Sequence, residues 1–300
     1  MISKTAMITI CGRPNVGKST LTNALAGEKI AIVSNKPQTT RNRITAVCQR
    51  GETQFVFLDT PGFHKPRTRL GDYMVNVVRQ SVADVDAVVL VVEPVASLGP
   101  QERELIASIK AANCPAVLAI NKLDTVEPEK QPEKLLAVIA LYSEAYAFNA
   151  IVPISAKTGD GVEELLKELD KFAVESPALF PEGVTTDQPE KQVCAELIRE
   201  KLLLNLECEV PHGTAVEITR FSERDDGIID LEATIYCEKA SHKGIIIGKH
   251  GAMLKKIGED ARKDIEEFMG TKVFLQTWVK VKEKWRDSNS LLRNFGYTDT

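Results

Sequence analysis

The sequence predicts an α/β domain with a mostly parallel sheet and helices on both faces, followed by a smaller α+β domain. Up to about residue 175, continuous apolar runs such as Ala87–Val92 alternate with amphipathic segments of helical period. That alternation is typical of parallel strands buried on both faces. Beyond residue 190 the order changes to helix, strand, strand, glycine loop, helix and strand. Two domains of different architecture are therefore expected.

The first domain is expected to contain strands and helices in regular alternation. The expected strands are 7–11, 44–49, 53–59, 87–93, 116–122 and 150–156. The expected helices are 18–26, 70–82, 101–112, 133–147 and 162–173. The two runs on either side of Gly51 and Glu52 predict one antiparallel hairpin at the edge of the sheet.

A segment rich in Pro and Gly separates the two domains. Residues 175–192 contain Pro177, Pro181, Pro189 and Gly183 and sustain neither a helical nor a strand period. We therefore assign 1–175 to the first domain, 176–190 to the linker, 191–286 to the second domain and 287–300 to a C-terminal tail. The second domain is expected to comprise helix 191–206, strands 215–221 and 228–237, helix 253–268 and strand 273–281. The tail is either a short helix or an ordered extension.

Composition excludes several classes of protein. The longest apolar runs are far shorter than the ~18 residues that a bilayer span requires. The first twelve residues lead directly into a strand and a glycine loop without the apolar core of a signal peptide, so a cytoplasmic location is expected. Six dispersed cysteines predict reduced thiols rather than a disulfide framework or a zinc site. The net charge of −4 argues against general polyanion binding, although it does not exclude a local basic patch.

The stretch GRPNVGKST follows the first predicted strand and leads into the first helix. It matches G-x-x-x-x-G-K-[ST] at Gly12, Gly17, Lys18 and Ser19. Glycines in this pattern let successive backbone N–H groups point at phosphates, to which the helix N-terminus adds positive potential. Lys18 is expected to reach the β- and γ-phosphates, and the Ser19 hydroxyl to bind Mg²⁺. The pattern alone also fits an ordinary glycine turn with a solvated lysine.

Two later motifs supply further candidates for the phosphate and metal site. DTPG places Asp59 directly after a strand, where its carboxylate can hold a water of the Mg²⁺ shell, and Gly62 where its N–H can contact the γ-phosphate. Between the motifs, PQTTR lies on a polar loop that can supply a threonine to the metal. We choose Thr40 over Thr39 for that role.

Base recognition is predicted from NKLD and SAK, each at the end of a strand. The Asp124 carboxylate can accept hydrogen bonds from guanine N1–H and the 2-amino group, which adenine lacks. Lys122 is expected to lay its stem over the base, and Asn121 to tie this loop to the phosphate loop. Ala156 is expected to present its N–H to guanine O6. Each triplet alone fits a surface turn, but their order at strand ends predicts a GTP site.

Together these elements resemble the translation-factor-like class of P-loop GTPases. The residues that the resemblance assigns to GTP binding are Gly12, Asn15, Val16, Gly17, Lys18, Ser19, Thr20, Asp59, Gly62, Asn121, Lys122, Asp124, Ser155, Ala156 and Lys157. Those assigned to the metal are Ser19, Thr40 and Asp59, and those assigned to hydrolysis are Lys18, Thr40 and Gly62.

Two departures within these motifs bear on hydrolysis. Phe63 follows DTPG where many GTPases carry a water-orienting glutamine, so slow or assisted hydrolysis is expected. Asn15 resembles the subgroup in which a potassium ion replaces an arginine finger, and potassium dependence is a hypothesis from that resemblance.

The second domain contains a G-x-x-G loop, Gly248-Lys249-His250-Gly251, ahead of an amphipathic helix. Such a loop allows close approach of a sugar-phosphate backbone, although a bare G-x-x-G also occurs in ordinary helix-entry turns. Residues 239–286 hold twelve lysines and arginines against six acidic residues, a local net charge of +6. We predict an RNA site at these four residues and Lys255, in a domain that resembles the type II KH fold. None of the four histidines is assigned a catalytic role.

A P-loop GTPase domain followed by a KH domain resembles the Era family of bacterial GTPases along essentially the whole chain. The resemblance implies binding to the 3′ region of small-subunit ribosomal RNA and a role in assembly of the small subunit and rRNA maturation. It also implies a peripheral fraction at the inner membrane. A monomer is expected. On this interpretation GTP and Mg²⁺ order the PQTTR and DTPGFHKP loops, and hydrolysis releases them.

Two other classes of function remain open at this point. A nucleotide or metabolite kinase uses the same phosphate loop, and competition between GTP and ATP distinguishes it. A protein-interaction adaptor has a second domain that never meets RNA. Changing Gly248 or Gly251 to aspartate is expected to abolish RNA binding without affecting the fold, whereas retained binding favours the adaptor.

Overall fold

The computed structural model describes residues 2–63, 66, 68–82, 85–126 and 132–297. His64 and Lys65 of the DTPGFHKP loop, and the last three residues of the predicted tail, lie outside the described residues. The chain divides into two compact units. The first comprises residues 1–31, 40–66 and 74–187, and the second comprises 32–39, 67–73 and 188–300.

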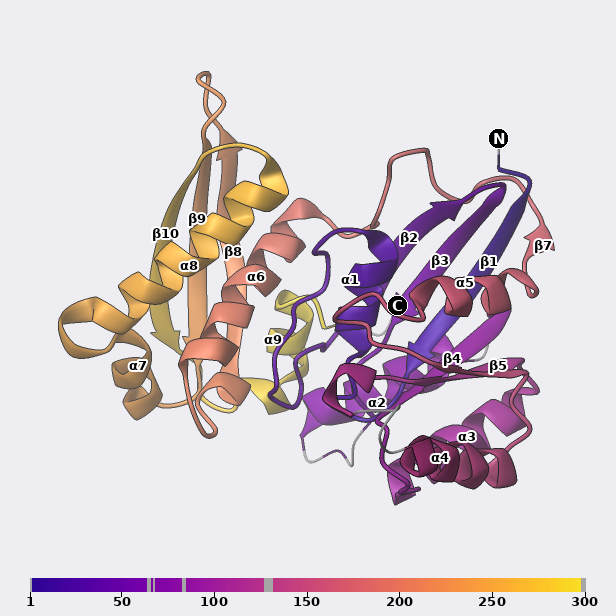
Figure 1. Cartoon of the computed structure of the whole chain (residues 1–300). Helices are drawn as coiled ribbons and strands as arrows, with labels where there is room; N and C mark the ends of the chain where they lie inside the picture. Colours follow the sequence, from indigo (N-terminus) through magenta and orange to yellow (C-terminus); the bar gives the residue numbers. More distant parts are fainter. Residues whose placement is uncertain (1, 64–65, 67, 83–84, 127–131, 298–300) are drawn as a thin grey trace. The chain divides into compact units, whose positions relative to one another are not determined.

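The first unit is built on a sheet whose strands alternate with helices (Figure 1). Its strands are β1 (Lys4–Cys11), β2 (Ile44–Arg50), β3 (Thr53–Asp59), β4 (Ala87–Val92), β5 (Ala116–Ile120), β6 (Ala150–Pro153) and the short β7 (Val174–Glu175). Its helices are α1 (Lys18–Ala26), α3 (Pro100–Ala112), η1 (Leu123–Thr125), α4 (Pro132–Ala145) and α5 (Val162–Asp170). Helix α2 (Arg69–Ser81) begins in residues assigned to the second unit and ends in the first.

The strand order β2-β3-β1-β4-β5-β6 confirms the predicted sheet. Strands β3, β1, β4, β5 and β6 pair in parallel, and β2 pairs antiparallel with β3 at the edge, as expected from the hairpin around Gly51. Parallel pairing directs the carboxyl ends of these strands to one edge of the sheet, where ligands bind in open α/β folds. The loops that carry GRPNVGKST, DTPG, NKLD and SAK all leave from that edge.

Each face of this sheet has its own hydrophobic core, and β4 shows the division. Val89 and Val91 belong to the cluster that includes α1 and α5, whereas Val88 and Leu90 belong to the cluster that includes α3 and α4. Alternate residues of a strand point to opposite faces, so a strand covered on both sides is apolar throughout. This explains why Ala87–Val92 is an uninterrupted buried run.

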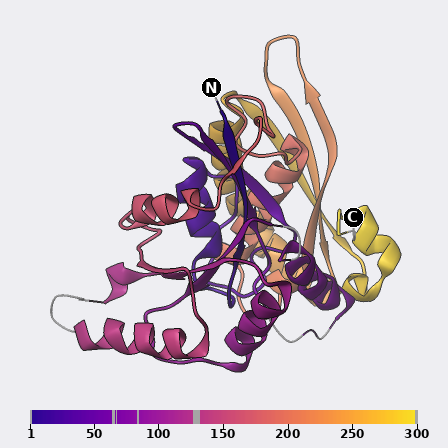
Figure 2. The same cartoon turned by 90° about the vertical axis from the view of Figure 1, so that its right-hand side faces the viewer.

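The second unit has the predicted α+β order, and α7 is added between the predicted second strand and the glycine loop. Its elements are α6 (Glu190–Asn205), η2 (Pro211–Gly213), β8 (Thr214–Glu223), β9 (Ile229–Cys237), α7 (Ala240–Ile247), η3 (Lys249–Gly251), α8 (Ala252–Met269), β10 (Val273–Val281), η4 (Trp285–Asp287) and α9 (Asn289–Asn294). The sheet order is β10-β9-β8, with β8 antiparallel and β10 parallel to β9. Figure 2 shows the long β8–β9 hairpin extending beyond the rest of its sheet.

Helices α6 and α8 cover one face of this smaller sheet (Figure 1). Leu197 and Leu202 of α6 and Ile257 and Ile265 of α8 are fully buried in one cluster with the strands. The buried side chains include Ile198 and Leu202 on α6, which are four residues apart. On α8, Ile257, Ala261 and Ile265 have the same spacing, which is the helical period that predicted both helices. None of the described helices is long and apolar enough to cross a membrane.

The segment assigned to the linker is held along the first unit rather than extended. Val174 and Glu175 form β7, which pairs antiparallel with β1. The Gln54 side chain accepts hydrogen bonds from the N–H groups of Leu179 and Phe180, at 2.8 and 3.0 Å. These contacts with β1 and β3 join residues far apart in the sequence, so composition alone did not reveal them. The last change of unit along the chain falls between residues 187 and 188.

The C-terminal tail is ordered by a short helix and aromatic packing. Ser288 caps α9 by accepting a hydrogen bond from Leu291 N–H at 3.4 Å. Trp285 is completely buried, donates its Nε1–H to the Gly213 carbonyl at 2.9 Å, and packs against the rings of Phe295 and Tyr297. Of the two alternatives that the sequence left open, the structure contains the short helix.

Candidate nucleotide and nucleic-acid sites

The GRPNVGKST loop connects the carboxyl end of β1 to the start of α1. Lys18, the first residue of α1, donates its Nζ–H groups to the carbonyls of Gly12 and Arg13 at 3.2 and 3.0 Å. Gly17 adopts a φ of 96°, and a Cβ there would lie 2.3 Å from Asn121 Nδ2. Only glycine meets both conditions at this position. The loop therefore closes around Lys18 in the way that its sequence predicted.

Lys18 is almost completely buried, with 6% of its surface exposed. Burial lowers the pKa of its ammonium group, while the negative charge of Asp59 opposes that shift. A buried cation held by backbone carbonyls is stabilised further when a phosphate anion approaches. This arrangement suits the predicted role of Lys18 toward the β- and γ-phosphates.

Three oxygen-bearing side chains meet beside Lys18, and we call them the oxygen cluster: Ser19, Thr40 and Asp59. Ser19 Oγ lies 2.7 Å from Thr40 Oγ1 and donates to Asp59 Oδ2 at 2.9 Å. All three side chains are buried. They come from α1, the loop after α1 and the end of β3, so only the fold brings them together. The structure thus assembles the three residues predicted as the metal site.

Thr39 lies outside this cluster. Its hydroxyl donates to the Lys36 carbonyl at 2.6 Å and lies 2.8 Å from Ser34 Oγ. Those local bonds turn the Thr39 side chain away from Ser19. The preference for Thr40 over Thr39 therefore agrees with the geometry.

The chemistry of the oxygen cluster fits Mg²⁺, which prefers oxygen ligands. Asp59 Oδ1 is buried and has no hydrogen-bond partner among the described residues. Burial raises the pKa of Asp59 to about 6, although the positive charge of Lys18 opposes that rise. A divalent cation or a water of its shell would satisfy the orphaned oxygen and favour the ionised carboxylate.

Gly62 and Phe63 lie beside the phosphate loop, but they face different surroundings. A Cβ at Gly62 would lie 2.8 Å from Pro14 Cα, so the backbone approaches the loop more closely than a side chain would permit. Phe63 donates its N–H to the Gly12 carbonyl at 3.2 Å, and its ring is buried in the apolar cluster of α3 and β4. The ring has no polar atom with which to orient water. Its burial is consistent with the expectation that another group assists hydrolysis.

The NKLD and SAK loops join in one hydrogen-bonded unit. Asn121 Nδ2 donates to the Val16 carbonyl at 2.8 Å, which ties this unit to the phosphate loop as predicted. Ser155 Oγ donates to Asp124 Oδ1 at 2.8 Å, and Lys157 Nζ lies 4.0 Å from Asp124 Oδ2. These two contacts fix the carboxylate that was predicted to select guanine.

The Ala156 N–H has a protein partner that the sequence did not reveal. This N–H donates to Asn121 Oδ1 at 2.9 Å, so this donor already has a protein partner. The sequence could not reveal that bond because Asn121 and Ala156 lie 35 positions apart. For guanine O6 to use the same N–H, the bond to Asn121 would have to be shared.

An acidic residue that sequence reasoning missed lies next to Lys122. Glu93 directly follows β4, and its Oε1 accepts a hydrogen bond from Lys122 Nζ at 2.6 Å. The other carboxylate oxygen of Glu93 lies 3.4 Å from Arg13 of the phosphate loop. Glu93 thus connects the two loops. Its position at the carboxyl end of a central strand was the available signal.

The remaining predicted nucleotide residues lie around the same loop. Val16 is buried, and its carbonyl accepts the hydrogen bond from Asn121. Thr20 is half-buried in the first turn of α1. Asn15 is exposed and has a φ of 66°, a left-handed conformation that asparagine tolerates better than most residues.

The G-x-x-G loop of the second unit forms the sharp turn between α7 and α8. Gly248 has a φ of 71°, and a Cβ there would lie 2.6 Å from Met253 Cβ. Lys249 and His250 are both exposed. The two central residues therefore face solvent, as predicted for residues that meet a phosphate backbone.

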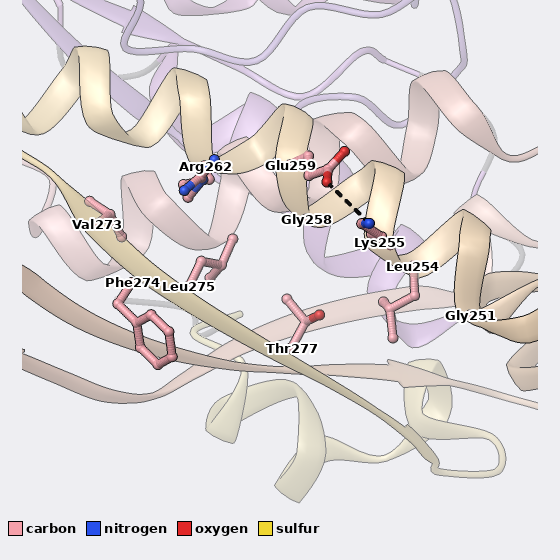
Figure 3. Close-up of a pocket in the computed structure, with 10 residues that line it drawn as sticks. All are labelled: Gly251, Leu254, Lys255, Gly258, Glu259, Arg262, Val273, Phe274, Leu275 and Thr277. Carbon is pink, nitrogen blue, oxygen red and sulfur yellow. Dashed lines mark ion pairs between the residues drawn. The ribbon is translucent and has the colours of Figure 1, made fainter.

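A groove of about 500 Å³ runs between α8 and β10, next to that turn. We call it the α8–β10 groove. Its lining residues are Gly251, Leu254, Lys255, Gly258, Glu259, Arg262, Val273, Phe274, Leu275 and Thr277. Figure 3 shows Leu254, Leu275 and Thr277 between the helix and the strand, with Lys255 and Glu259 joined by an ion pair of 3.9 Å.

The groove contains two of the predicted RNA residues, Gly251 and Lys255, and adds others. Arg262 lies seven positions after Lys255 on α8, which places both cations on one side of the helix. That spacing was a sequence signal for Arg262 that the prediction did not use. The β10 residues had no such signal, because they reach the groove through parallel pairing with β9, which lies far away in the sequence.

Two family descriptions match this chain in the same order as its two units. The family described as "50S ribosome-binding GTPase" matches residues 7–122, and the KH domain family matches residues 209–286. The fold and the nucleotide site thus define a P-loop GTPase with a C-terminal KH domain.

Full-length relatives narrow the class. GTPase Era of Ruminiclostridium cellulolyticum is 52% identical over 99% of this chain and 98% of its own length. GTPase Era of Clostridium kluyveri is 49% identical over 98% of this chain and 99% of its own length. The chain belongs to the GTPase Era family and is a GTPase, as the sequence motifs predicted.

Solved structures of this family superimpose on the whole chain. An alanine variant of Aquifex aeolicus Era bound to GDP·AlF4⁻ has a TM-score of 0.94 at 37% identity, with 99% of this chain and all of that chain covered. Era in complex with MgGDPNP and nucleotides 1506–1542 of 16S ribosomal RNA has a TM-score of 0.93 at the same identity and coverage.

Proposed function

We propose that this GTPase is a Mg²⁺-dependent switch that binds the 3′ region of small-subunit ribosomal RNA through its KH domain and acts in assembly of the small subunit. GTP is held by the phosphate loop and by the NKLD and SAK loops. RNA is held by the Gly248–Gly251 turn and the α8–β10 groove. By thermodynamic reciprocity, RNA then changes the affinity for GTP by the same factor as GTP changes the affinity for RNA.

The nucleotide half of the proposal assigns a role to each group described above. Ser19 and Thr40 ligate Mg²⁺ directly, and Asp59 accepts a hydrogen bond from a water of the metal shell. Lys18 and the backbone N–H of Gly62 contact the γ-phosphate. Bound Mg²⁺ neutralises charge that develops on the phosphate oxygens during hydrolysis. The solved relative with MgGDPNP supports this assignment.

The α8–β10 groove is the observation that carries the RNA half of the proposal. Its lining includes apolar side chains of α8 and β10, its helical side carries Lys255 and Arg262, and Gly251 of the G-x-x-G turn also lines it. KH domains use this combination to hold about four unstacked nucleotides, with phosphates at the turn and bases in the groove. The relative solved with 16S nucleotides supports ribosomal RNA as the partner.

Binding of short RNAs by the full chain tests this assignment. A fragment from the 3′ end of 16S rRNA is compared with a shuffled sequence of the same length and with a 23S rRNA fragment, in the presence of a non-hydrolysable GTP analogue. We expect at least tenfold tighter binding of the 16S fragment, the low end of what a few base contacts supply. The 23S rRNA fragment is included because the family that matches residues 7–122 is described as binding the 50S ribosome. Tighter binding of the 23S fragment would overturn the assignment to the small subunit.

The structure changes the choice of variants for that experiment. Gly248→Asp is not expected to leave the fold unaffected, because its Cβ would press on Met253 at 2.6 Å. Gly251 has open space around its Cβ position but a φ of 80°. Alanine in place of the exposed Lys249 avoids both forms of strain, whereas His250 itself has a φ of 51°. RNA affinity that is unchanged in the Lys249→Ala, Arg262→Ala double variant would favour the protein-interaction adaptor.

Potassium dependence of hydrolysis is a separate part of the proposal. Asn15 lies in the phosphate loop with its side chain exposed. A monovalent cation beside it would supply positive charge to the transferring phosphoryl group where many GTPases use an arginine. We expect faster turnover in KCl than in NaCl at equal ionic strength, and loss of that difference in Asn15→Ala. Equal turnover in the two salts would remove potassium from the mechanism.

The location of the protein also belongs to the proposal. We propose that it is cytoplasmic and monomeric, with a fraction held peripherally at the inner membrane. Fractionation of cells in low and high salt tests the membrane part, because an electrostatic surface contact is released by salt. Light scattering of the purified chain tests the monomer.

A further inference from the structure

Residues 32–39, which immediately precede Thr40, belong to the second compact unit. Ile32 is 1% exposed and is part of the same apolar cluster as Val193 and Leu197 of α6. The loop that ends at a proposed metal ligand is therefore packed against a helix of the KH-containing unit. The start of this loop is therefore fixed by apolar packing.

The C-terminal end of this segment is held by one arginine. Arg199 of α6 has a completely buried side chain, 1% exposed, and donates through Nη1 to the Gln38 carbonyl at 3.3 Å and through Nη2 to the Thr39 carbonyl. Glu196, one turn earlier on α6, accepts from Arg199 Nε at 2.8 Å and fixes the plane of the guanidinium group. A planar donor held in this way binds two successive carbonyls in one orientation.

Two further contacts hold the rest of the segment. Glu200 Oε1, next to Arg199 on α6, accepts a hydrogen bond from Val33 N–H at 2.9 Å. Lys36 Nζ donates to the carbonyl of Leu206, just after the end of α6. The segment is thus held near its start, its middle and its end. We call this set the α6 contacts: Arg199, Glu200 and Lys36.

The chain itself carries these contacts to the oxygen cluster. Thr40 directly follows Thr39, and consecutive Cα atoms are 3.8 Å apart, so a displaced Thr39 carbonyl displaces Thr40. Thr40 Oγ1 lies 2.7 Å from Ser19 Oγ. Misplacement by about 1 Å of a group that positions a reacting phosphate is sufficient to reduce turnover strongly.

We propose that Arg199 is a positioning residue for GTP: through the carbonyls of Gln38 and Thr39 it sets the position of Thr40 at Mg²⁺, so the KH-containing unit controls the metal-binding loop. The inference rests on the proposed role of Thr40. It assigns to α6 a part in the GTP state that is distinct from the RNA contacts of α8 and β10. GDP binding does not need Thr40, because ordering of this loop requires the γ-phosphate.

The experiment compares affinities for Mg·GDPNP and Mg·GDP in four full-length variants: Arg199→Met, Arg199→Lys, Lys36→Met and Thr40→Ala. In Arg199→Met we expect the affinity for Mg·GDPNP to fall about tenfold, which is the size of effect that one charge-assisted hydrogen bond produces. The affinity for Mg·GDP is expected to change less than twofold. Arg199→Lys is expected to restore part of the loss. Arg220→Met removes an exposed arginine from the same unit and is the matched control, with both affinities unchanged.

A purely structural role of Arg199 predicts a different pattern. It would lower the unfolding temperature and change both affinities alike, leaving their ratio as in the parent, and that result would overturn the proposal. If Arg199→Met does not fold, Lys36→Met decides, because Lys36 is half-buried and its loss leaves the cluster of α6 intact. An unchanged GDPNP-to-GDP ratio in Lys36→Met would then overturn the proposal.

Thr40→Ala separates this inference from the proposed function on which it rests. If Thr40→Ala leaves the affinity for Mg·GDPNP unchanged, the assignment of Thr40 to the metal is wrong and the inference falls with it. If Thr40→Ala weakens Mg·GDPNP but Arg199→Met does not, the metal site holds and only control by α6 is overturned.

Discussion

The nucleotide site and the α8–β10 groove place their polar side chains in opposite relations to water. Lys18, Ser19 and Asp59 are at most 8% exposed, and each has at least one partner within the protein. On the groove, the Lys255 side chain is 77% exposed, and its ion pair with Glu259 spans 3.9 Å. Buried polar groups require their partners, whereas exposed charges lose little when a partner is removed.

This contrast indicates how each site selects its ligand. The nucleotide site uses preorganised hydrogen bonds in a dry environment, so one changed atom alters recognition strongly. The groove relies on cations in high dielectric, where each contributes modestly and salt competes. Substitutions at the two sites should therefore differ in size and in salt dependence.

Asp124→Asn is the change with the largest expected effect. An amide keeps one acceptor oxygen and presents an N–H in place of the other, so guanine loses the partner of its 2-amino group and the 2-oxo group of xanthine gains a donor. We expect preference for GTP over XTP to fall by on the order of 10⁴-fold, measured by competition with a labelled nucleotide. Unaltered discrimination between the two nucleotides in this variant would show that Asp124 does not contact the base.

Lys249→Ala combined with Arg262→Ala tests the solvated side of the comparison. We expect RNA affinity to fall about tenfold at moderate salt, and the slope of log affinity against log salt to decrease by about 1.4, since each contact with single-stranded RNA contributes about 0.7. The unfolding temperature should change little because Lys249 is exposed. A loss that does not depend on salt would mean that these cations act by shape rather than charge.

Ser155→Ala should produce a smaller change at the buried site. The hydroxyl donates to Asp124 Oδ1 at 2.8 Å. Its loss removes one hydrogen bond to a carboxylate, and we expect GDP and GTP affinities to fall together by about tenfold or less, or up to ~1.4 kcal/mol. Thr158→Ala, in the same loop but bonded to Asp160 rather than Asp124, is the matched control and should bind both nucleotides as the parent does.

Asp59 should give the smallest effect, a pH dependence of stability in the absence of nucleotide and metal. Its pKa is about 6 in the folded chain, above the ordinary value of 3.8, so between these values the folded state binds more protons than the unfolded state. Stability should therefore rise by about 1 kcal/mol as pH falls from 7 to 5, relative to Asp59→Asn. Urea unfolding of both proteins at the two pH values measures this difference.

The same titration should act in the opposite direction on metal affinity. A proton on Asp59 removes the negative charge that favours a divalent cation, so Mg²⁺-dependent GTP binding should weaken below about pH 6, the pKa of that carboxyl group in the folded chain. Stability and metal binding that changed in the same direction would mean that another group titrates in this range.

Motifs at strand ends made most of the nucleotide site predictable. Gly12, Lys18 and Ser19 follow one strand, Asp59 another and Asn121 a third, and parallel topology alone brings such residues to one edge. What could not be predicted depends on contacts between distant segments. The bond of Ala156 to Asn121 and the contact of Glu93 with Lys122 exist only after β4, β5 and β6 have paired.

The second unit was less predictable for the same physical reason. Helical period predicted α6 and α8, but α7 is a short helix with mixed exposure, in which Ile245 is half exposed and Ile246 buried. The β10 side of the groove is defined by parallel pairing with β9, between residues about 44 positions apart. Likewise, composition predicted a linker at 176–190, whereas the Gln54 side chain binds the backbone of Leu179 and Phe180 within it.

Phe295 and Tyr297, close to the C-terminus, stabilise the second unit by packing against Trp285. Because the indole is wholly enclosed and Phe295 and Tyr297 supply part of its enclosure, a chain shortened before residue 295 would leave a large ring facing solvent. Such truncated forms should bind hydrophobic dyes and be cut readily by proteases.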